Sequence, residues 1–522
     1  MKPGESHQSV SEFQASLQRA RGQRLSNCMR TSHIHLFHFA LLALFFHAAA
    51  YADETFQVPT GERQLFLDDL GIAKIDRLRR IMHPPRKRGA VIEPDKPWET
   101  VLQTRCAPVW DEQAKRFKLW LITSTPVEGV AGTTYAESPD GIRWTKPILR
   151  QSLFQGSPEN NFVALDPNSA WPANAMENVV YDPDDPDPQR RFKGFLGANG
   201  RQPIVSPDGI RWKKLEVPPL PSQDESNLSY DRPSRRFIAT LKKGGPFGRS
   251  HALWISPDFE KWTNSGVLLH ADEEDQRLAK ENIRARLADA RFQAPRYNKP
   301  ADYNADLYNV GVFRYEGLYV GLPAVYHATG KLPTVNTDGF HLIQLISSRD
   351  LRTWQRLGDR QPFIGPSPVG AGAYDLTQLL PPSGPVLRDE ELWFYYTGIK
   401  YREEPANAPP GGKGAICLAV LRRDGFVSLD AGEHHGTITT KPFQWKGGKL
   451  LVNFETREGG ELRAVVLDPA GAVVATSRPM SGDHARSEMR WSQGSLEMLR
   501  GQLVSLRFTL REASLYSYWV EE

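Results

Sequence analysis

A seven-residue string, SPDGIRW, occurs twice in the chain, at 138–144 and again at 206–212. Looser copies follow: SPDFEKW at 256–262, SRDLRTW at 348–354, and a degraded fifth copy, RRDGFVSL, at 422–429. Each copy comes after a short apolar run. An Asp that can accept turn amides, a Gly that permits positive φ and a Trp available for packing are typical of a tight hairpin turn. The repeat therefore predicts several copies of one β-structured unit.

A second kind of hairpin alternates with these turns. Strand, polar turn and strand follow one another in VWDEQAKRFKLWLI, VVYDPDDPDPQRRFKGFLG, LSYDRPSRRFIATL, VFRYEGLYVGL and LPPSGPVLRDEELWFYYTG. In each repeat this hairpin comes first, which gives four strands per unit and five units at intervals of 50 to 92 residues. Repeated four-stranded antiparallel units are typical of a β-propeller. The alternative interpretation is five unrelated hairpins in stacked sandwiches.

The predicted fold class is therefore all-β, with a five-bladed β-propeller over 98–435 and a C-terminal β-sandwich over 436–522. In the C-terminal part the repeat stops, and runs such as KLLVNFET and ELRAVVLD alternate apolar and polar residues, as strands with one buried face do. A lead-in segment, 53–97, is expected to pack on the propeller, with its QLFLDD strand (64–69) at a blade edge. Residues 275–306 interrupt the pattern as a helix and a loop, either a lid or a surface insertion.

The first 52 residues predict an upstream extension and a secretory signal peptide. The apolar run IHLFHFALLALFFHAAA, 34–50, follows Arg30 and ends in a small-x-small exit, so cleavage is expected after Ala52. Met29 is the suspected true start. The mature protein is then expected to be secreted or periplasmic, with no integral membrane span; the alternative is a membrane anchor.

Composition and motifs exclude several other classes of function. A formal net charge of +4 gives no electrostatic case for nucleic acid. No Cys/His cluster has zinc-site spacing, and Cys106 and Cys417 are expected to be buried thiols. The acidic string DPDDPDPQ, 182–189, fits a solvated hairpin tip better than a calcium loop. No phosphate loop, dinucleotide fingerprint or nucleophile elbow occurs, so we predict no metal and no cofactor.

An acidic residue stands just before or at the start of the predicted first strand in every unit. These acids are Glu99, Glu177, Asp224 with Glu225, Asp306 and Asp375. The first strands of propeller blades line the central channel, so the five positions are predicted to converge on one face. A single carboxylate in such a place is ordinarily solvated or caps a loop. Several like charges gathered in one funnel cost energy, and this favours a function for them.

Glycoside chemistry is the use that this arrangement favours. One protonated carboxyl group gives a proton to the leaving oxygen, and a second carboxylate attacks the anomeric carbon or activates water. The predicted catalytic residues are Glu99, Glu177, Asp224 and Glu225, and the predicted substrate-binding residues are Trp98, Asp306, Tyr308 and Asp375. The nearby aromatic residues Trp171, Tyr303 and Tyr374 either stack on sugars or pack in the fold. Arg105 and Arg249 are interpreted as members of structural ion pairs.

The chain resembles a known family in the strings that surround these positions. The blade turns, the lead-in strings QLFLDD and KPWE, the string LRRDGFVSL and the terminal LRFTLREASLYSYWV are similar to those of secreted bacterial proteins classed as glycoside hydrolase family 32-like. The resemblance covers nearly all of 53–522. It implies a five-bladed propeller followed by a β-sandwich. Related propellers without that sandwich belong to family 43 and to the mannoside phosphorylases of family 130.

The catalytic motifs of family 32 do not occur in this chain. The family carries a Trp-Met-Asn-Asp-Pro-Asn-Gly nucleophile motif, an Arg-Asp-Pro motif and a Glu-Cys acid motif. By blade position alone, the resemblance implies that Glu99 is nucleophile or base, Glu177 a hydroxyl-binding stabiliser, and Glu225 or Asp224 the proton donor. The turns are also similar to the sialidase Asp-box, but a sialidase further needs an arginine cluster and a catalytic Tyr, so we rank that interpretation lower.

The leading hypothesis is a secreted, metal-independent glycoside hydrolase that acts on a poly- or oligosaccharide through paired carboxylates in the propeller funnel. The first alternative is a non-catalytic carbohydrate-binding propeller that keeps the fold without the acid pair. The second alternative is a glycoside phosphorylase, in which phosphate replaces water if basic groups line the funnel.

Overall fold

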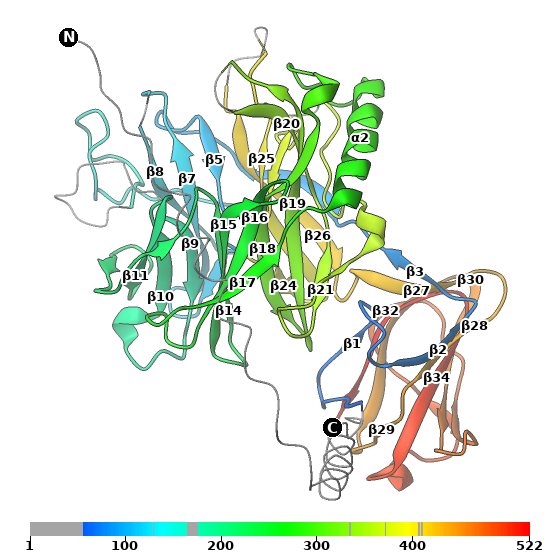
Figure 1. The fold of residues 1–522 in the computed structure, drawn as a ribbon. Helices are drawn as coiled ribbons and strands as arrows, with labels where there is room; N and C mark the ends of the chain where they lie inside the picture. The colour runs from blue at the N-terminus through cyan, green and yellow to red at the C-terminus, as the bar shows by residue number, and fades with distance from the viewer. Residues whose placement is uncertain are drawn as a thin grey trace, which may run out of the picture. The chain divides into compact units, whose positions relative to one another are not determined.

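The computed structural model describes residues 56–128, 130–163, 176–333, 336–370, 372–405, 408 and 411–522. The predicted signal peptide and Trp171 lie outside these ranges. In the described part, the chain forms five β-sheets and a single α-helix, so the all-β class is confirmed (Figure 1). Short 3-10 helices occur at Pro188–Arg190, Pro300–Asp302, Gly358–Arg360 and Glu497–Leu499. None of the described helices is both long enough and apolar enough to cross a membrane.

Three consecutive sheets are antiparallel, and their strands pair in chain order. The first sheet contains β9 (Met176–Tyr181), β10 (Phe192–Leu196), β11 (Gly200–Ser206) and β12 (Lys213–Lys214), with β13 (Leu220–Pro221) beside β11. The second contains β14 (Ser226–Asp231), β15 (Arg236–Gly245), β16 (Gly248–Ser256) and β17 (Thr263–Leu269). The third contains β18 (Asn304–Tyr315), β19 (Leu318–Lys331), β21 (Ile346–Ser348) and β22 (Gln355–Arg356), with β20 (Thr337–Ile343) beside β19.

A fourth, nine-stranded sheet joins the beginning and the end of the repeat region. Its early strands are β5 (Val101–Gln103), β6 (Val109–Asp111), β7 (Arg116–Ser124) and β8 (Ala131–Ser138). Its late strands are β23 (Gln378–Leu380), β24 (Val386–Arg388), β25 (Glu391–Ile399) and β26 (Gly414–Arg422). The two groups meet where Gly414 of β26 pairs in parallel with Val101 of β5.

The ninth strand of this sheet comes from the lead-in segment. It is β4 (Arg86–Ile92), which pairs antiparallel with β26 and so supplies the outer strand of the last unit. The prediction for the QLFLDD string was wrong, because its strand β1 (Gln64–Leu65) pairs with the C-terminal strand at Tyr518 and Ser517. The lead-in therefore contributes one strand to the fourth sheet and others to the C-terminal sheet.

The C-terminal sheet has eleven strands in the described residues and is built around two long ones. These are β30 (Lys449–Leu467) and β34 (Leu503–Glu521), which pair antiparallel over most of their length. The remaining strands are β1, β2 (Ile72–Asp76), β3 (Arg79–Met82), β27 (Val427–Ala431), β28 (Gly436–Thr440), β29 (Phe443–Gln444), β31 (Val473–Ser477), β32 (Asp483–Glu488) and β33 (Trp491–Gln493). Apolar side chains of both long strands are buried in one core.

The four clear copies of the repeated turn share one set of hydrogen bonds. The Ser hydroxyl accepts the N–H three residues on at 2.8–2.9 Å, and the Asp carboxylate accepts the next two amides at 2.8–3.0 Å. The Trp indole donates to the carbonyl of the residue after Asp. That residue has positive φ in every copy: Gly141, Gly209, Phe259 and Leu351. The turns also tie neighbouring units together, because the indole of Trp120 in β7 donates to the Gly209 carbonyl at 2.7 Å.

The insertion contains the helix α2 (Glu273–Ala288), which begins with a capping box between Asp272 and Asp275. Asp275 pairs with Arg356 at 2.6 Å, and the buried Arg286 donates to the Leu376 carbonyl at 2.5 Å. These contacts fix the helix beside the third sheet, as Figure 1 shows.

Candidate functional site

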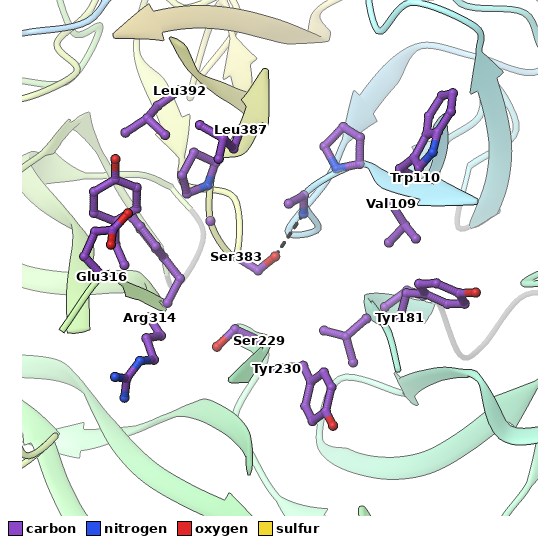
Figure 2. Close-up of a pocket in the computed structure, with 18 residues that line it drawn as sticks. Val109, Trp110, Tyr181, Ser229, Tyr230, Arg314, Glu316, Ser383, Leu387 and Leu392 are labelled. Carbon is purple, nitrogen blue, oxygen red and sulfur yellow. Dashed lines mark hydrogen bonds between the residues drawn. The ribbon is translucent and has the colours of Figure 1, made fainter. Parts of the chain in front are cut away.

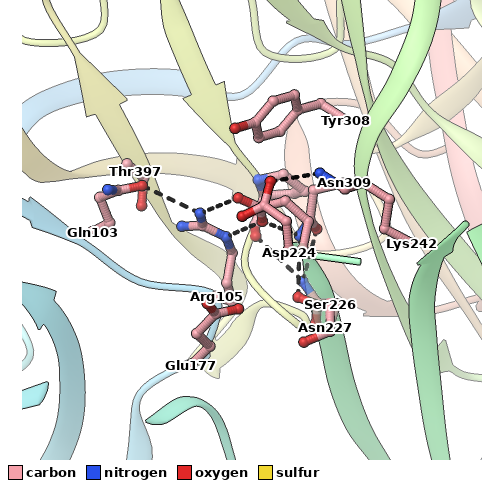
Figure 3. Close-up of polar contacts among 12 residues, drawn as sticks. Gln103, Arg105, Glu177, Asp224, Ser226, Asn227, Lys242, Tyr308, Asn309 and Thr397 are labelled. Carbon is pink, nitrogen blue, oxygen red and sulfur yellow. Dashed lines mark hydrogen bonds and ion pairs between the residues drawn. The ribbon is translucent and has the colours of Figure 1, made fainter. Parts of the chain in front are cut away.

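Eight polar residues, which lie on strands of neighbouring sheets or in the loops next to those strands, form what we call the polar cluster (most are drawn in Figure 3). The members are Arg105, Glu177, Arg201, Asp224, Glu225, Lys242, Tyr308 and Asn309. Hydrogen bonds link the first strands here: the Ser226 hydroxyl donates to Asn178 at 2.5 Å, and Asn309 donates to the Ser226 carbonyl at 3.1 Å. Residues far apart in the sequence are therefore held at one end of β9, β14 and β18.

Glu225 and Arg105 form a buried ion pair between two sheets. The Arg105 guanidinium binds both carboxylate oxygens, with Nε 2.6 Å from Oε2 and Nη2 2.7 Å from Oε1. Asn309 also donates to Oε2 at 2.8 Å. Burial alone would raise the pKa of Glu225, but the charge and hydrogen bonds of Arg105 outweigh burial and lower it to about 2. Glu225 is thus ionised, and both of its oxygens are occupied.

Glu177 lies in the same cluster, but its pKa is shifted in the opposite direction to that of Glu225. Its Oε2 accepts a hydrogen bond from Arg201 at 2.8 Å, and its side chain is 12% exposed. Burial raises the pKa of Glu177 to about 7; Arg201 opposes the rise, and the charge of Glu225 adds to it. The negative charge of Glu225 therefore helps to keep the neighbouring Glu177 protonated.

Asp224 is the most exposed acid of the cluster. Its side chain is 60% exposed, and its carboxylate lies 2.5 Å from the ammonium group of Lys242. Its backbone has φ 69°, a left-handed conformation that costs a non-glycine residue energy. Arg201, which is fully buried, donates to the Asp224 carbonyl as well as to Glu177. One guanidinium therefore positions two of the three carboxylic acids.

Tyr308 of the cluster and Asp306 beside it both lie on β18. The Tyr308 ring centre lies 5.0 Å from the ammonium of Lys242 and 4.7 Å from the guanidinium carbon of Arg249. Arg249 in turn binds the Asp306 carboxylate, with its Nε 2.8 and 2.9 Å from the two oxygens. Both predicted substrate-binding residues on this strand thus lie beside cations.

Glu99 and Trp98 contact residues outside the polar cluster. The Oε2 of Glu99 lies 2.6 Å from the ammonium of Lys146 and accepts the amides of Asp95 and Lys96. The Trp98 indole donates to Asn161 at 2.9 Å, and its rings pack with two buried phenylalanines. Burial raises the pKa of Glu99. No contact among the described residues joins either side chain to the polar cluster.

Asp375 is also tied up outside the cluster. Its Oδ2 lies 2.7 Å from the ammonium of Lys87 in β4, and it accepts the hydroxyls of Tyr396 at 2.8 Å and Ser367 at 3.0 Å. The carboxylate is buried, and it links the last unit to the strand that the lead-in supplies. The Tyr374 hydroxyl donates to Glu93, and the Tyr303 hydroxyl donates to Asn298, so neither contacts the polar cluster through its hydroxyl. Of the residues predicted from the sequence, the cluster itself brings together Glu177, Asp224, Glu225 and Tyr308.

Several members of the cluster were not predicted from the sequence. Arg201 and Lys242 lie on the third and second strands of their sheets, and Asn309 lies inside a first strand. The available signal was Arg105, a charged residue between the strands β5 and β6 of the first unit, which was interpreted from the sequence as a member of a structural ion pair.

A cavity of about 490 Å³ lies at the other end of the same first strands (Figure 2). The cavity is lined by Trp110, Tyr181 and Tyr230, which lie near the ends of β6, β9 and β14, together with Ser229 and Glu316. Each of the three aromatic rings packs on a Phe that is the first or second residue of the following strand, with centroids 4.5–4.8 Å apart. This end of the strands is therefore dominated by repeated aromatic packing.

Two free, buried thiols, Cys106 and Cys417, occur in the described residues, as expected. Cys106 packs in the cluster's floor, where its sulfur accepts the Val179 amide and contacts the Glu177 carbonyl. Among the same residues, no group of three or more His, Cys, Asp and Glu side chains is placed to hold a metal ion.

Comparison with known proteins gives structural similarities at low sequence identity. No protein-family model and no curated protein matches the chain. A solved glycoside hydrolase covers 65% of this chain and 92% of its own at 14% identity and a TM-score of 0.41. A family 32 β-fructofuranosidase from Bombyx mori covers 84% and 94% at 11% identity and 0.38. An α-L-arabinofuranosidase from Podospora anserina covers 66% and 98% at 12% identity and 0.39. Similarity at this level assigns neither family nor activity to the chain.

Proposed function

We propose that this chain is an exported, glycan-active enzyme that hydrolyses glycosidic bonds with the carboxyl groups of the polar cluster. The observation that carries the proposal is Glu177, a largely buried acid held by Arg201 beside the ionised Glu225. A carboxyl group that keeps its proton near neutral pH can donate it to a leaving glycosidic oxygen. The sugar would be a poly- or oligosaccharide substrate.

The proposal gives the three acids different roles. Glu177 is the proton donor. Asp224, exposed beside Lys242, is the nucleophile or the base that activates water. Glu225 is an ionised anchor, because both of its oxygens already accept hydrogen bonds from Arg105 and Asn309. These roles differ from those that blade position alone implied, in which Glu177 was the stabiliser.

The proposed architecture is a five-bladed β-propeller over 98–435 followed by a β-sandwich over 436–522. Four-stranded antiparallel units, cross-linked through the first strands and the repeated turns, support the propeller. Strand β4 supports closure, because it completes the last unit with a segment that precedes the first. The long pair β30 and β34 with its buried face supports the sandwich.

Phosphorolysis is a second candidate, and the cations around Tyr308 favour it. Lys242, Arg249 and Arg402 all approach this ring within 6 Å. Phosphate held by such groups could take the place of water at the anomeric carbon. Measuring sugar release with and without inorganic phosphate separates the two reactions, because phosphorolysis yields a glycosyl phosphate.

The test is a screen of the purified protein on fructans, arabinans, xylans and mannosides, repeated with E177Q. On any substrate that is cleaved, we expect E177Q to lower kcat by about 10²- to 10⁴-fold, because it removes the proton donor. The matched control is E99Q, which changes a buried, lysine-bound glutamate outside the cluster and should alter kcat less than threefold. Loss of activity in E99Q with activity kept in E177Q would overturn the assignment. No product on any glycan would favour the non-catalytic binding propeller.

A further inference from the structure

Two arginines next to the polar cluster share the faces of two tyrosines. The guanidinium carbon of Arg249 lies 4.7 Å from the Tyr308 ring centre and 4.6 Å from that of Tyr326. The guanidinium carbon of Arg402 lies 5.7 and 5.6 Å from the same two ring centres. Two positive groups are thus held close together against an aromatic surface, where cation–π attraction offsets part of their repulsion.

The two arginines differ in how their charge is balanced. Arg249 is paired with the Asp306 carboxylate through Nε. Arg402 donates from Nη1 to the Gln378 side-chain oxygen at 3.0 Å and from Nε to the Thr337 carbonyl at 3.2 Å, and both acceptors are neutral. Within the described part of the chain, no carboxylate pairs with Arg402. A half-buried guanidinium without a counter-ion is ready to bind an anion.

The wider neighbourhood also has an excess of positive charge. Five cations are gathered in and beside the polar cluster: Arg105, Arg201, Lys242, Arg249 and Arg402. Four carboxylic acids face them: Glu177, Asp224, Glu225 and Asp306. Because Glu177 holds a proton up to about neutral pH, the acids do not cancel the cations. A neutral sugar alone would leave this charge uncompensated.

The floor between the two tyrosines is a buried imidazole that supplies no counter-charge. The His341 ring centre lies 4.7 Å from that of Tyr308 and 5.0 Å from that of Tyr326. It is completely buried, and neither ring nitrogen has a hydrogen-bond partner among the described residues. Burial, with the charges of Arg402 and Arg249, holds its pKa well below the ordinary value, so the ring is neutral.

We propose that Arg402, with Arg249, forms an anion subsite, and that the substrate of this chain carries a sugar carboxylate that binds there. A guanidinium presents two parallel N–H groups that match the two oxygens of a carboxylate. Tyr308, which is only partly buried, offers an aromatic side chain to the ring of the same sugar residue, whereas Tyr326 is fully buried. The inference rests on the proposed function for its substrate class. The same subsite chemistry would also accept inorganic phosphate, so the test includes both sources of the anion.

The experiment is isothermal titration of the full protein, at one fixed ionic strength, with four probes: galacturonate, glucuronate, neutral galactose and inorganic phosphate. We expect a sugar acid to bind at least tenfold more tightly than galactose. R402Q should abolish that preference, R402K should weaken it, and R352Q, which removes an exposed arginine in an outer turn, should keep it. Thermal unfolding of each variant verifies that it is folded.

Three results would overturn the inference. The first is binding of both sugar acids no tighter than that of galactose, and the second is an unchanged preference in R402Q and R402K. The third is binding of phosphate alone that R402Q removes, which would assign the subsite to a phosphate co-substrate. Because binding is measured without turnover, a failure of hydrolysis in the glycan screen does not alter these outcomes. The substrate class and the reaction are therefore tested separately.

Discussion

The outer turns and the polar cluster both contain acidic residues, but they use them in opposite ways. Each turn Asp is held by amides of its own hairpin, and the four turns repeat the same bonds. In the cluster, Arg105 of one sheet binds Glu225 of another, and Asn309 reaches Glu225 from a third. Hydrogen bonds that stay within one hairpin and recur in every turn are typical of residues that stabilise the fold. Hydrogen bonds and ion pairs that join units, and that differ from unit to unit, indicate a candidate functional site.

This contrast predicts different costs for breaking an ion pair in the two regions. Arg105→Met should destabilise the fold by about 3–5 kcal/mol, because it leaves the Glu225 carboxylate buried without its partner. Arg211→Met breaks the pair with Asp208 in an outer turn, where Arg211 is 78% exposed, and should cost less than about 0.5 kcal/mol. Urea unfolding of both variants measures the difference.

The double variant R105M/E225L serves as the control for this prediction. Replacing both charges with apolar groups removes the unpaired carboxylate and should recover most of the stability lost in R105M. If R105M instead unfolds at the same urea concentration as the wild type, Glu225 gains nothing from the pair and the comparison between the two regions fails.

A smaller effect is expected from a glycine in an outer turn. Gly209 has φ 78°, and a Cβ there would lie 2.5 Å from the Trp120 ring. Gly209→Ala should therefore cost about 2 kcal/mol, from the left-handed backbone and from displacement of Trp120. Gly61 has nearly the same φ, 79°, with nothing within 4 Å, so Gly61→Ala isolates the backbone part. Equal losses of melting temperature in the two variants would show that the turn does not lock neighbouring sheets.

The sequence predicted the repeated parts of the fold because repetition makes a weak signal visible. The turns at Asp140 and Asp208 and the hairpins between them were located from residue types with fixed physical roles. Strand β4 was missed because the lead-in contains no repeat, and its partner β26 is more than 300 residues away along the chain. Pairing over such distances depends on the assembled sheet and leaves no local pattern.

The candidate site was predictable only in part, for the same reason. Glu177 and Glu225 were found because each stands at the start of a first strand. Glu99 and Asp375 matched that pattern equally well, but lysines from other segments, Lys146 and Lys87, bind them elsewhere. The residues that distinguish the cases are these partners, and only the tertiary structure brings partners to an acid.

A pH-dependent effect on stability is expected as well, and its sign is opposite in the two regions. The pKa of Glu177 is raised to about 7, chiefly by burial, from an ordinary 4.5, so the folded protein holds this proton more tightly than the unfolded chain. Its contribution to stability is complete below pH 4.5 and is lost as pH rises through 7. The pKa of Asp140 is lowered from 3.8, chiefly by the Arg143 amide, so its contribution is complete above that pH and is lost on acidification. Replacing Glu177 with Gln should flatten the decline in unfolding free energy between pH 5 and 8, whereas Asp140→Asn should flatten the acid limb alone. Urea midpoints measured from pH 3 to 8 decide this, since a common change in both variants would mean that the two kinds of acid are held in the same way.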